Sequence, residues 1–91
     1  MVQPITLLVK KYFNNNLKAL AKIIKLSKQN GFAYYHEIKK YLNRERNQVS
    51  TILGKLENDN LITRDKDHRP QKIFPTLAGK ELLKKIVDLL S

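Results

Sequence analysis

Apolar residues recur with the period of an α-helix in two stretches of the chain. A spacing of i, i+3, i+4 and i+7 is typical of a helix that buries one face. The two sets with this spacing are Leu17, Leu20, Ala21 and Ile24, and then Val49, Ile52, Leu53 and Leu56. They predict one helix that runs from an N-cap at Asn16 to a stop at Asn30-Gly31, and another over residues 45–59.

Shorter signals predict the other helices. Residues 36–42 have the spacing of a short helix, and Thr76 is a suitable N-cap for a last helix within residues 76–91. The side chains expected to face inward from the short helix are Ile38, Tyr41 and Leu42. Residues 1–16 are an apolar N-terminal extension, expected to be helical, that ends in three asparagines.

The period changes after the helix over 45–59. Residues 61–64 and 72–75 are short strand-like runs on either side of a turn-prone segment. They predict a two-stranded hairpin whose wing covers residues 65–72. The whole chain, residues 1–91, is then a single domain of the α+β class, mainly α.

Positive charge is the most pronounced feature of the composition. The chain has 18 Lys and Arg against 8 Asp and Glu, which gives a formal net charge of +10. This excess favours a polyanionic partner, nucleic acid before an anionic membrane. Since no apolar run approaches the ~20 residues of a membrane span, we expect a cytoplasmic protein without a membrane partner.

Candidate chemistry for an enzyme is sparse. The chain has no cysteine, which excludes disulfides and thiolate zinc sites, and its two histidines, His36 and His68, lie in no catalytic motif. Asp65, Asp67 and His68 resemble a metal site only weakly, because aspartates at such positions usually stabilise a turn. We expect no catalytic activity, no metal and no cofactor.

Four segments, in the right order and at the right gaps, resemble the DNA-binding lobe of MarR-type transcriptional regulators and their small archaeal and viral relatives. They are residues 35–42 (YHEIKKYL), 49–57 (VSTILGKLE), 60–64 (NLITR) and 76–83 (TLAGKELL). Asn60 stands where the family usually has glycine, and asparagine tolerates the same left-handed backbone. The ArsR and PadR types share most of the pattern. The resemblance implies a winged helix-turn-helix, with a three-helix core, a two-stranded wing and flanking helices.

The helix over 45–59 is the expected recognition helix. Its outward side chains are of the kinds that read base edges in the major groove: amides pair with adenine, arginine with guanine, and a threonine methyl contacts thymine. The candidate DNA-binding residues here are Arg44, Arg46, Asn47, Gln48, Ser50, Thr51 and Lys55. The alternative is an ordinary solvated polar face.

The wing is expected to lie at the minor groove, as the resemblance implies. Arg69 is the side chain best suited to enter it, since a narrow minor groove concentrates negative potential. The candidate wing residues are Arg64, Lys66, His68, Arg69, Gln71 and Lys72. Lys18, Lys22 and Lys25 share the outer side of the helix that follows Asn16, where they either contact phosphates or only keep the surface soluble.

Both terminal segments are richer in apolar residues than a lone domain needs, which indicates an interface. In MarR-like proteins the flanking helices form a twofold dimer, so we expect a homodimer on double-stranded DNA. The candidate interface residues are Leu7, Leu8, Tyr12, Leu83, Ile86, Val87 and Leu90. Packing of both segments on their own core is the alternative.

The expected function is sequence-specific binding of double-stranded DNA by a transcriptional regulator. A small-molecule effector is not expected, since the chain is shorter than most MarR-type proteins. The alternative function is a protein-interaction module or an architectural component of a transcription or replication assembly, in which the third helix of the winged helix packs against protein.

Overall fold

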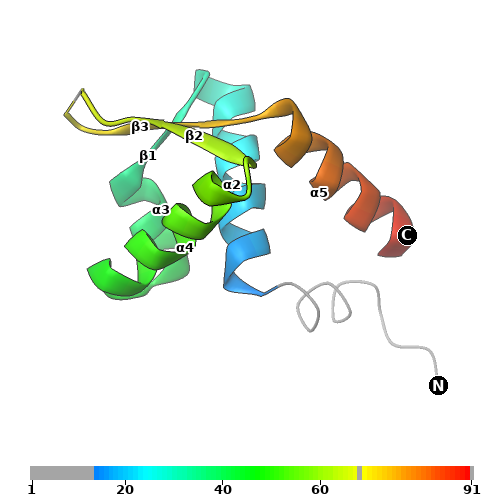
Figure 1. The fold of residues 1–91 in the computed structure, drawn as a ribbon, viewed down its shortest axis with the longest axis horizontal. Helices are drawn as coiled ribbons and strands as arrows, with labels where there is room; N and C mark the ends of the chain where they lie inside the picture. Colours follow the sequence, from blue (N-terminus) through cyan, green and yellow to red (C-terminus); the bar gives the residue numbers. More distant parts are fainter. Residues whose placement is uncertain (1–13, 68, 91) are drawn as a thin grey trace.

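The computed structural model describes residues 14–67 and 69–90 (Figure 1). The predictions for Leu7, Leu8, Tyr12 and His68 lie outside these residues, as does the side chain of Leu90. In chain order the elements are α2 (Asn15–Asn30), β1 (Ala33–Tyr34), α3 (Tyr35–Leu42), α4 (Arg46–Asn58), β2 (Ile62–Asp65), β3 (Lys72–Pro75) and α5 (Leu77–Leu90). The predicted fold class is confirmed: the chain is a winged helix, mainly helical, with a small antiparallel sheet.

The first described helix begins earlier than predicted. Asn14, not Asn16, is the N-cap of α2, because its backbone is extended and its Oδ1 accepts a hydrogen bond from the Leu17 amide at 2.9 Å. The predicted stop is confirmed. Gly31 has a left-handed backbone, with φ of 90°, and its amide donates to the Ser27 carbonyl at 2.8 Å.

The core lies between α2 and the layer formed by α3, α4 and the sheet. Its largest fully buried side chains are Leu20, Ile23, Ile38, Val49, Leu53, Leu56, Ile62 and Ile73. The stripe predicted on α4 is buried at all four positions. On α2 the buried side is rotated relative to the predicted stripe, since two of the predicted residues, Leu17 and Ala21, are only half-buried. This helix touches α3, α4, α5 and the sheet, so its buried face is wider than one stripe.

Tyr41 is not an inward side chain, contrary to the prediction. It is 49% exposed, whereas Ile38 of the same helix is fully buried. Helix α3 has only about two turns, so Ile38 and Leu42 fill the side that meets the core. The ring of Tyr41 lies on the flank beside α2, with the Lys22 Nζ 5.1 Å from its centre.

The predicted hairpin is confirmed, and β1 adds a third strand to it. The strand order is β1-β3-β2, all antiparallel, with Thr63 opposite Phe74 and Ala33 opposite Ile73. Strand β1 is an edge of two residues, too short to show an alternating pattern in the sequence. The hairpin extends away from the helices as the wing (Figure 1).

Thr76 and Gly79 connect the sheet to the last helix. The Thr76 Oγ accepts a hydrogen bond from the Gly79 amide at 3.0 Å, which confirms the predicted N-cap, and donates to the Asn60 carbonyl at 2.8 Å. Asn60 has the left-handed backbone expected at this position, with φ of 61°. Helix α5 then leaves the body of the domain (Figure 1). Within residues 14–67 and 69–90, none of the helices has the length and apolar character needed to cross a membrane.

Candidate nucleic-acid interface

The outer face of α4 is polar, basic and open to solvent. All seven residues predicted for recognition are exposed, namely Arg44, Arg46, Asn47, Gln48, Ser50, Thr51 and Lys55. The six that lie on α4 are exposed because its buried stripe takes the other side of the helix, and Arg44 lies just before the helix. Gly54, which interrupts this helix, has no atom within 4 Å of where a Cβ would stand, so close packing within the domain is not its role.

Local hydrogen bonds fix which chemical groups this face presents. The Gln48 Oε1 accepts a hydrogen bond from the Glu45 amide at 3.3 Å, which leaves the Gln48 amino group as a donor. The Thr51 hydroxyl donates to the Asn47 carbonyl at 2.9 Å. The Thr51 methyl is therefore the part of this side chain best placed for contact with a thymine methyl.

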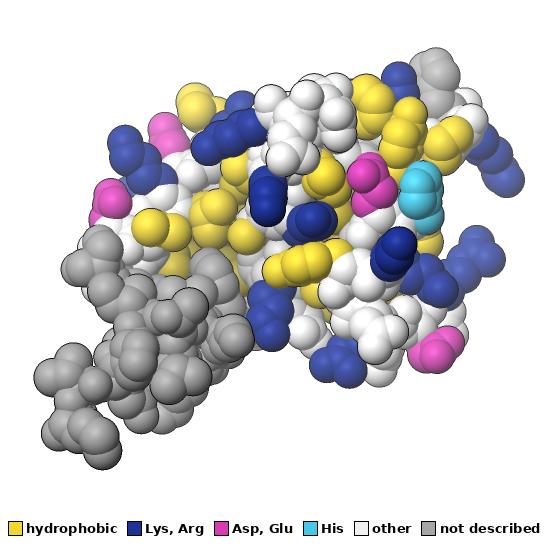
Figure 2. Space-filling view, turned by 180° about the vertical axis from the view of Figure 1, so that it is seen from behind, with side chains coloured by type: hydrophobic (Ala, Val, Ile, Leu, Met, Phe, Trp, Pro, Cys, Tyr) yellow, Lys and Arg dark blue, Asp and Glu magenta, His cyan; other side chains and the backbone are white. Residues whose placement is uncertain are grey.

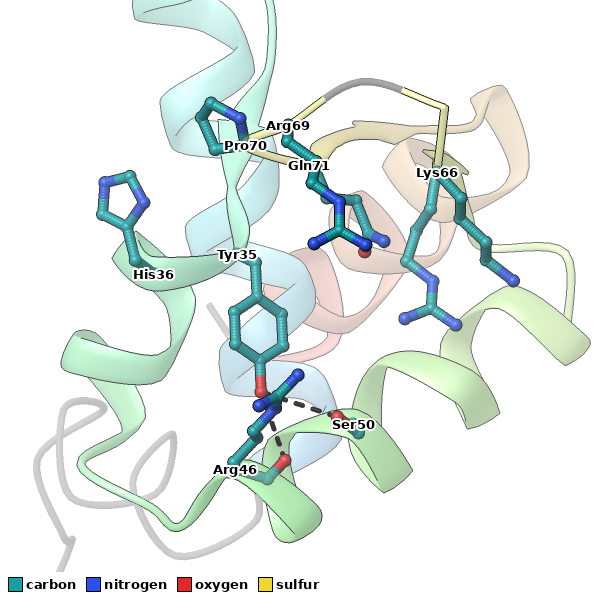
Figure 3. Close-up of a pocket in the computed structure, with 9 residues that line it drawn as sticks. Tyr35, His36, Arg46, Ser50, Lys66, Arg69, Pro70 and Gln71 are labelled. Carbon is teal, nitrogen blue, oxygen red and sulfur yellow. Dashed lines mark hydrogen bonds between the residues drawn. The ribbon is translucent and has the colours of Figure 1, made fainter.

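A groove of about 550 Å³ separates α4 from the wing (Figure 3). Its lining comes from α3, α4 and the wing and consists of Tyr35, His36, Arg46, Ser50, Arg64, Lys66, Arg69, Pro70 and Gln71. Among these described residues there are four side chains with a permanent positive charge and no acidic one. Figure 3 shows Arg69 and Gln71 extending from the wing toward α4. The arrangement suits a polyanionic chain such as a nucleic-acid backbone.

Tyr35 and His36 also line the groove, although the sequence predicts no role for either residue. The Tyr35 Oη donates to the Arg46 carbonyl at 3.2 Å and lies 3.5 Å from the Ser50 Oγ, so this tyrosine braces the first turn of α4 (Figure 3). One feature of the sequence could have pointed to Tyr35: the helix before it stops at Asn30-Gly31, so this tyrosine begins the next helix, α3. Its contact with α4 depends on tertiary packing.

A second, shallower hollow lies at the start of α4. It has a volume of about 600 Å³ and is lined by Asn15, Arg44, Asn47, Gln48, Thr51 and Ile52. The structure thus brings four of the predicted recognition residues together at one end of the helix. Asn15 joins them from α2, and Lys55 lines neither hollow.

The predicted wing residues divide into two groups. Lys66 and Arg69 are exposed and reach the groove together with Gln71. Lys72 does not, because its Nζ lies over the ring of Phe32, 4.6 Å from the centre. The Asp65 Oδ1 accepts a hydrogen bond from the Asp67 amide at 3.2 Å, which confirms the expected turn role. The described residues contain no cluster of three metal-ligating side chains.

Arg64 connects the wing to α4. Its guanidinium donates to the Glu57 carboxylate at 2.9 Å, and the Lys66 Nζ lies 3.4 Å from the same oxygen. The Arg64 side chain is 14% exposed and the Glu57 side chain is 31% exposed, so this ion pair is partly shielded from water. The hydrogen bond from Arg64 lowers the pKa of Glu57 below 4.5, against a smaller opposing effect of burial. Glu57 therefore holds the base of the wing against the recognition helix.

Glu57→Gln is expected to lower the free energy of unfolding by roughly 1–3 kcal/mol at pH 7, because the buried guanidinium loses its charged acceptor. Because the folded pKa of Glu57 is depressed, its contribution is present above about pH 4.5 and is lost as the pH falls through the lower folded value. Urea unfolding of both proteins from pH 7 to pH 3 measures this. The difference between them should shrink in acid, and a constant difference would contradict the assignment.

Comparisons with known proteins agree with this geometry. Protein-family models and curated protein sequences give no match. Among solved structures, AF1382 from Archaeoglobus fulgidus superimposes with a TM-score of 0.78 at 22% identity, over 90% of this chain and 91% of that one. The chain has the winged-helix fold of the MarR-type regulators. A MarR-family transcriptional regulator from Silicibacter pomeroyi has a TM-score of 0.66 at 19% identity, over 84% of this chain and 50% of that one.

Another similar structure is that of MepR, a transcription regulator of the Staphylococcus aureus multidrug efflux pump MepA. Its complex with DNA gives a TM-score of 0.69 at 25% identity, over 89% of this chain and 60% of that one. The chain thus spans about 60% of the length of MepR. Both MepR and the Silicibacter protein are transcription regulators.

Proposed function

We propose that the chain is a sequence-specific double-stranded DNA-binding protein that regulates transcription. Helix α4 enters the major groove, and the wing, with Arg69 at its tip, lies at the adjacent minor groove. The main observation behind this proposal is the exposed outer face of α4. It presents amide, hydroxyl and guanidinium groups beside a basic groove. The likeness to MepR, a protein solved in complex with DNA, supports it.

The residues divide into those that read bases and those that hold phosphates. Asn47, Gln48 and Thr51 lie on the first two turns of α4, where the side chains of a recognition helix reach base edges. Three residues line the groove between α4 and the wing and donate hydrogen bonds to DNA phosphates: Arg46, Lys66 and Gln71. Tyr35 positions the start of α4 through the Arg46 carbonyl.

Gln48→Ala and Thr51→Ala are each expected to relax the sequence preference. Each loses roughly 1–3 kcal/mol at one base pair, which is about 5- to 150-fold in affinity for the preferred duplex. Binding to random duplex should change little, because neither side chain is assigned to phosphate. Fluorescence anisotropy with both duplexes measures the difference, and Lys84→Ala on α5 is the control. Equal losses on preferred and random DNA would contradict the assignment of these two residues to bases.

The exposed apolar side chains of α5 support a homodimer. Leu77, Val87 and Leu89 are 72%, 49% and 85% exposed, while Leu83 and Ile86 are half-buried. The two recognition helices of a twofold dimer address half-sites about 34–36 Å apart, one turn of DNA. We therefore propose that the preferred site is an imperfect palindrome.

Val87→Glu is expected to shift the protein from dimer to monomer, since it places a charge within an apolar interface. Size-exclusion chromatography with light scattering at several concentrations measures the mass, with Lys84→Glu as the control for added charge on the same helix. Affinity for a full palindrome should fall while affinity for a half-site stays the same. A monomeric parent protein would refute the dimer and leave the assignment of α4 intact.

A further inference from the structure

The outer side of α2 carries a second concentration of positive charge, separate from the groove. Lys18, Lys22 and Lys25 are spaced i, i+4 and i+7 along this helix, opposite the side that Leu20 and Ile24 bury in the core. We call these three residues and Tyr41, which touches Lys22, the α2 lysine face. From 14 to 44 the described chain has seven Lys and Arg, namely Lys18, Lys22, Lys25, Lys28, Lys39, Lys40 and Arg44, and one acid, Glu37.

Glu37 does not neutralise this face. Its Oε1 accepts a hydrogen bond from the Tyr34 amide at 2.9 Å at the start of α3, and the side chain is half-buried. Glu57, which pairs with Arg64 and Lys66, lies at the far end of α4. Within residues 14–67 and 69–90, no acidic side chain pairs with Lys18, Lys22 or Lys25; Lys25 is exposed and the other two are half-buried.

The α2 lysine face and the proposed recognition face lie on different sides of the domain. Helix α4 lies in front of α2 in Figure 1, and the side chains that line the groove lie in front of α2 in Figure 3. Seen from behind, the molecule shows Lys and Arg side chains across the middle of the opposite face (Figure 2). A straight duplex seated against α4 and the wing would thus leave this face turned away from it.

We propose that the α2 lysine face binds the phosphate backbone of a second DNA duplex segment, so that the protein bridges two segments. From Lys18 to Lys25 the helix rises about 10.5 Å. Duplex DNA carries one negative charge per ~1.7 Å of axis, so each ammonium group meets a phosphate without a special register. The bridge rests on the proposed function, because α4 holds the first duplex.

The side-chain types favour a nucleic-acid backbone over an acidic protein. Protein interfaces are enriched in arginine and aromatic residues and depleted in lysine. The α2 lysine face has three lysines, no arginine, and one aromatic ring that already holds Lys22. Lysine is a strongly hydrated point charge that suits diffuse attraction to phosphates.

A two-step capture experiment tests the proposal. A biotinylated duplex on beads binds the protein, the excess is washed away, and a fluorescent random duplex is added at increasing salt. The parent protein should retain the second duplex. In the triple variant Lys18→Gln, Lys22→Gln, Lys25→Gln, retention should fall at least tenfold, and the salt slope of retention should drop by about three.

A matched control makes the same change of charge elsewhere. Lys80→Gln, Lys84→Gln, Lys85→Gln neutralises three exposed lysines of α5 and should leave retention of the second duplex unchanged. The double variant Lys18→Gln, Lys25→Gln keeps the contact between Lys22 and Tyr41, so it controls for any loss of folding that the triple variant causes. It should lower the salt slope of retention of the second duplex by about two.

The outcomes separate the two proposals. If no protein stays on the first duplex, the proposed function fails. If protein stays but the second duplex is not captured, the bridge is refuted. Equal capture by the parent and the α2 triple variant would assign bridging to the second α4 of a dimer and overturn the inference. Competition between polyanions gives a last outcome. The inference is also overturned if poly-glutamate displaces the second duplex at a lower concentration of negative charges than unlabelled random DNA needs, because the face would then prefer an acidic polypeptide.

Discussion

Gly79→Ala is expected to lower the free energy of unfolding by roughly 1–3 kcal/mol. Each kcal/mol lost should lower Tm by about 4–8 °C. A Cβ at this position would collide with the Leu61 carbonyl oxygen and come within 3.2 Å of Leu20 Cδ1. The carbonyl cannot move freely, because it accepts the Thr76 amide at 3.0 Å. The glycine is thus needed where α5 crosses the entry to β2.

Gly54→Ala is the matched control for this substitution. Both glycines lie within helices, but no atom outside the neighbouring backbone of α4 stands within 4 Å of a Cβ at Gly54. Without a clash, the better helix propensity of alanine should raise the free energy of unfolding by about 1 kcal/mol. Thermal and urea unfolding should give shifts of opposite sign for the two variants. Shifts of the same sign would contradict the packing at Gly79.

The affinity for duplex DNA is expected to fall by about 10³- to 10⁵-fold between 50 and 200 mM salt. This range corresponds to roughly 6–10 phosphate contacts and their released counterions. The net charge of +10 and the exposed cationic residues of the groove, Arg46, Lys66 and Arg69, supply such contacts. Lys66→Gln should reduce the log–log slope by about one, whereas Lys84→Gln on α5 should not. A nearly flat salt dependence would refute phosphate binding in the groove.

Helical period was sufficient to predict most of the fold. The stripe from Val49 to Leu56 located α4, because a helix with one buried face shows it directly in the order of residues. Thr76 and Gly31 marked helix ends through local hydrogen bonding and backbone geometry, which depend on few neighbours. Tyr41 and strand β1 were missed, since α3 is short and β1 pairs with a strand almost forty residues further along the chain.

The helical period of α4 also made part of the candidate site predictable. Once the buried side of α4 is known, Gln48 and Thr51 must lie on the other side, and the structure places them there. The ion pair of Glu57 with Arg64 and the contact of Tyr35 with α4 could not be predicted. Both join residues whose distance depends on how the wing and α3 pack against α4. The contact of Lys72 with Phe32 could not be predicted either, because it depends on how β1 and β3 pair.

Selection of duplexes from a random pool tests the central claim most directly, because it requires that the outer face of α4 discriminate among sequences. The account predicts that the protein enriches one family of sequences, built from two related half-sites about one helical turn apart. Gln48→Ala should enrich a family in which one position of each half-site has become degenerate. A pool that stays random after selection, while the protein still binds duplex, would contradict sequence recognition by α4.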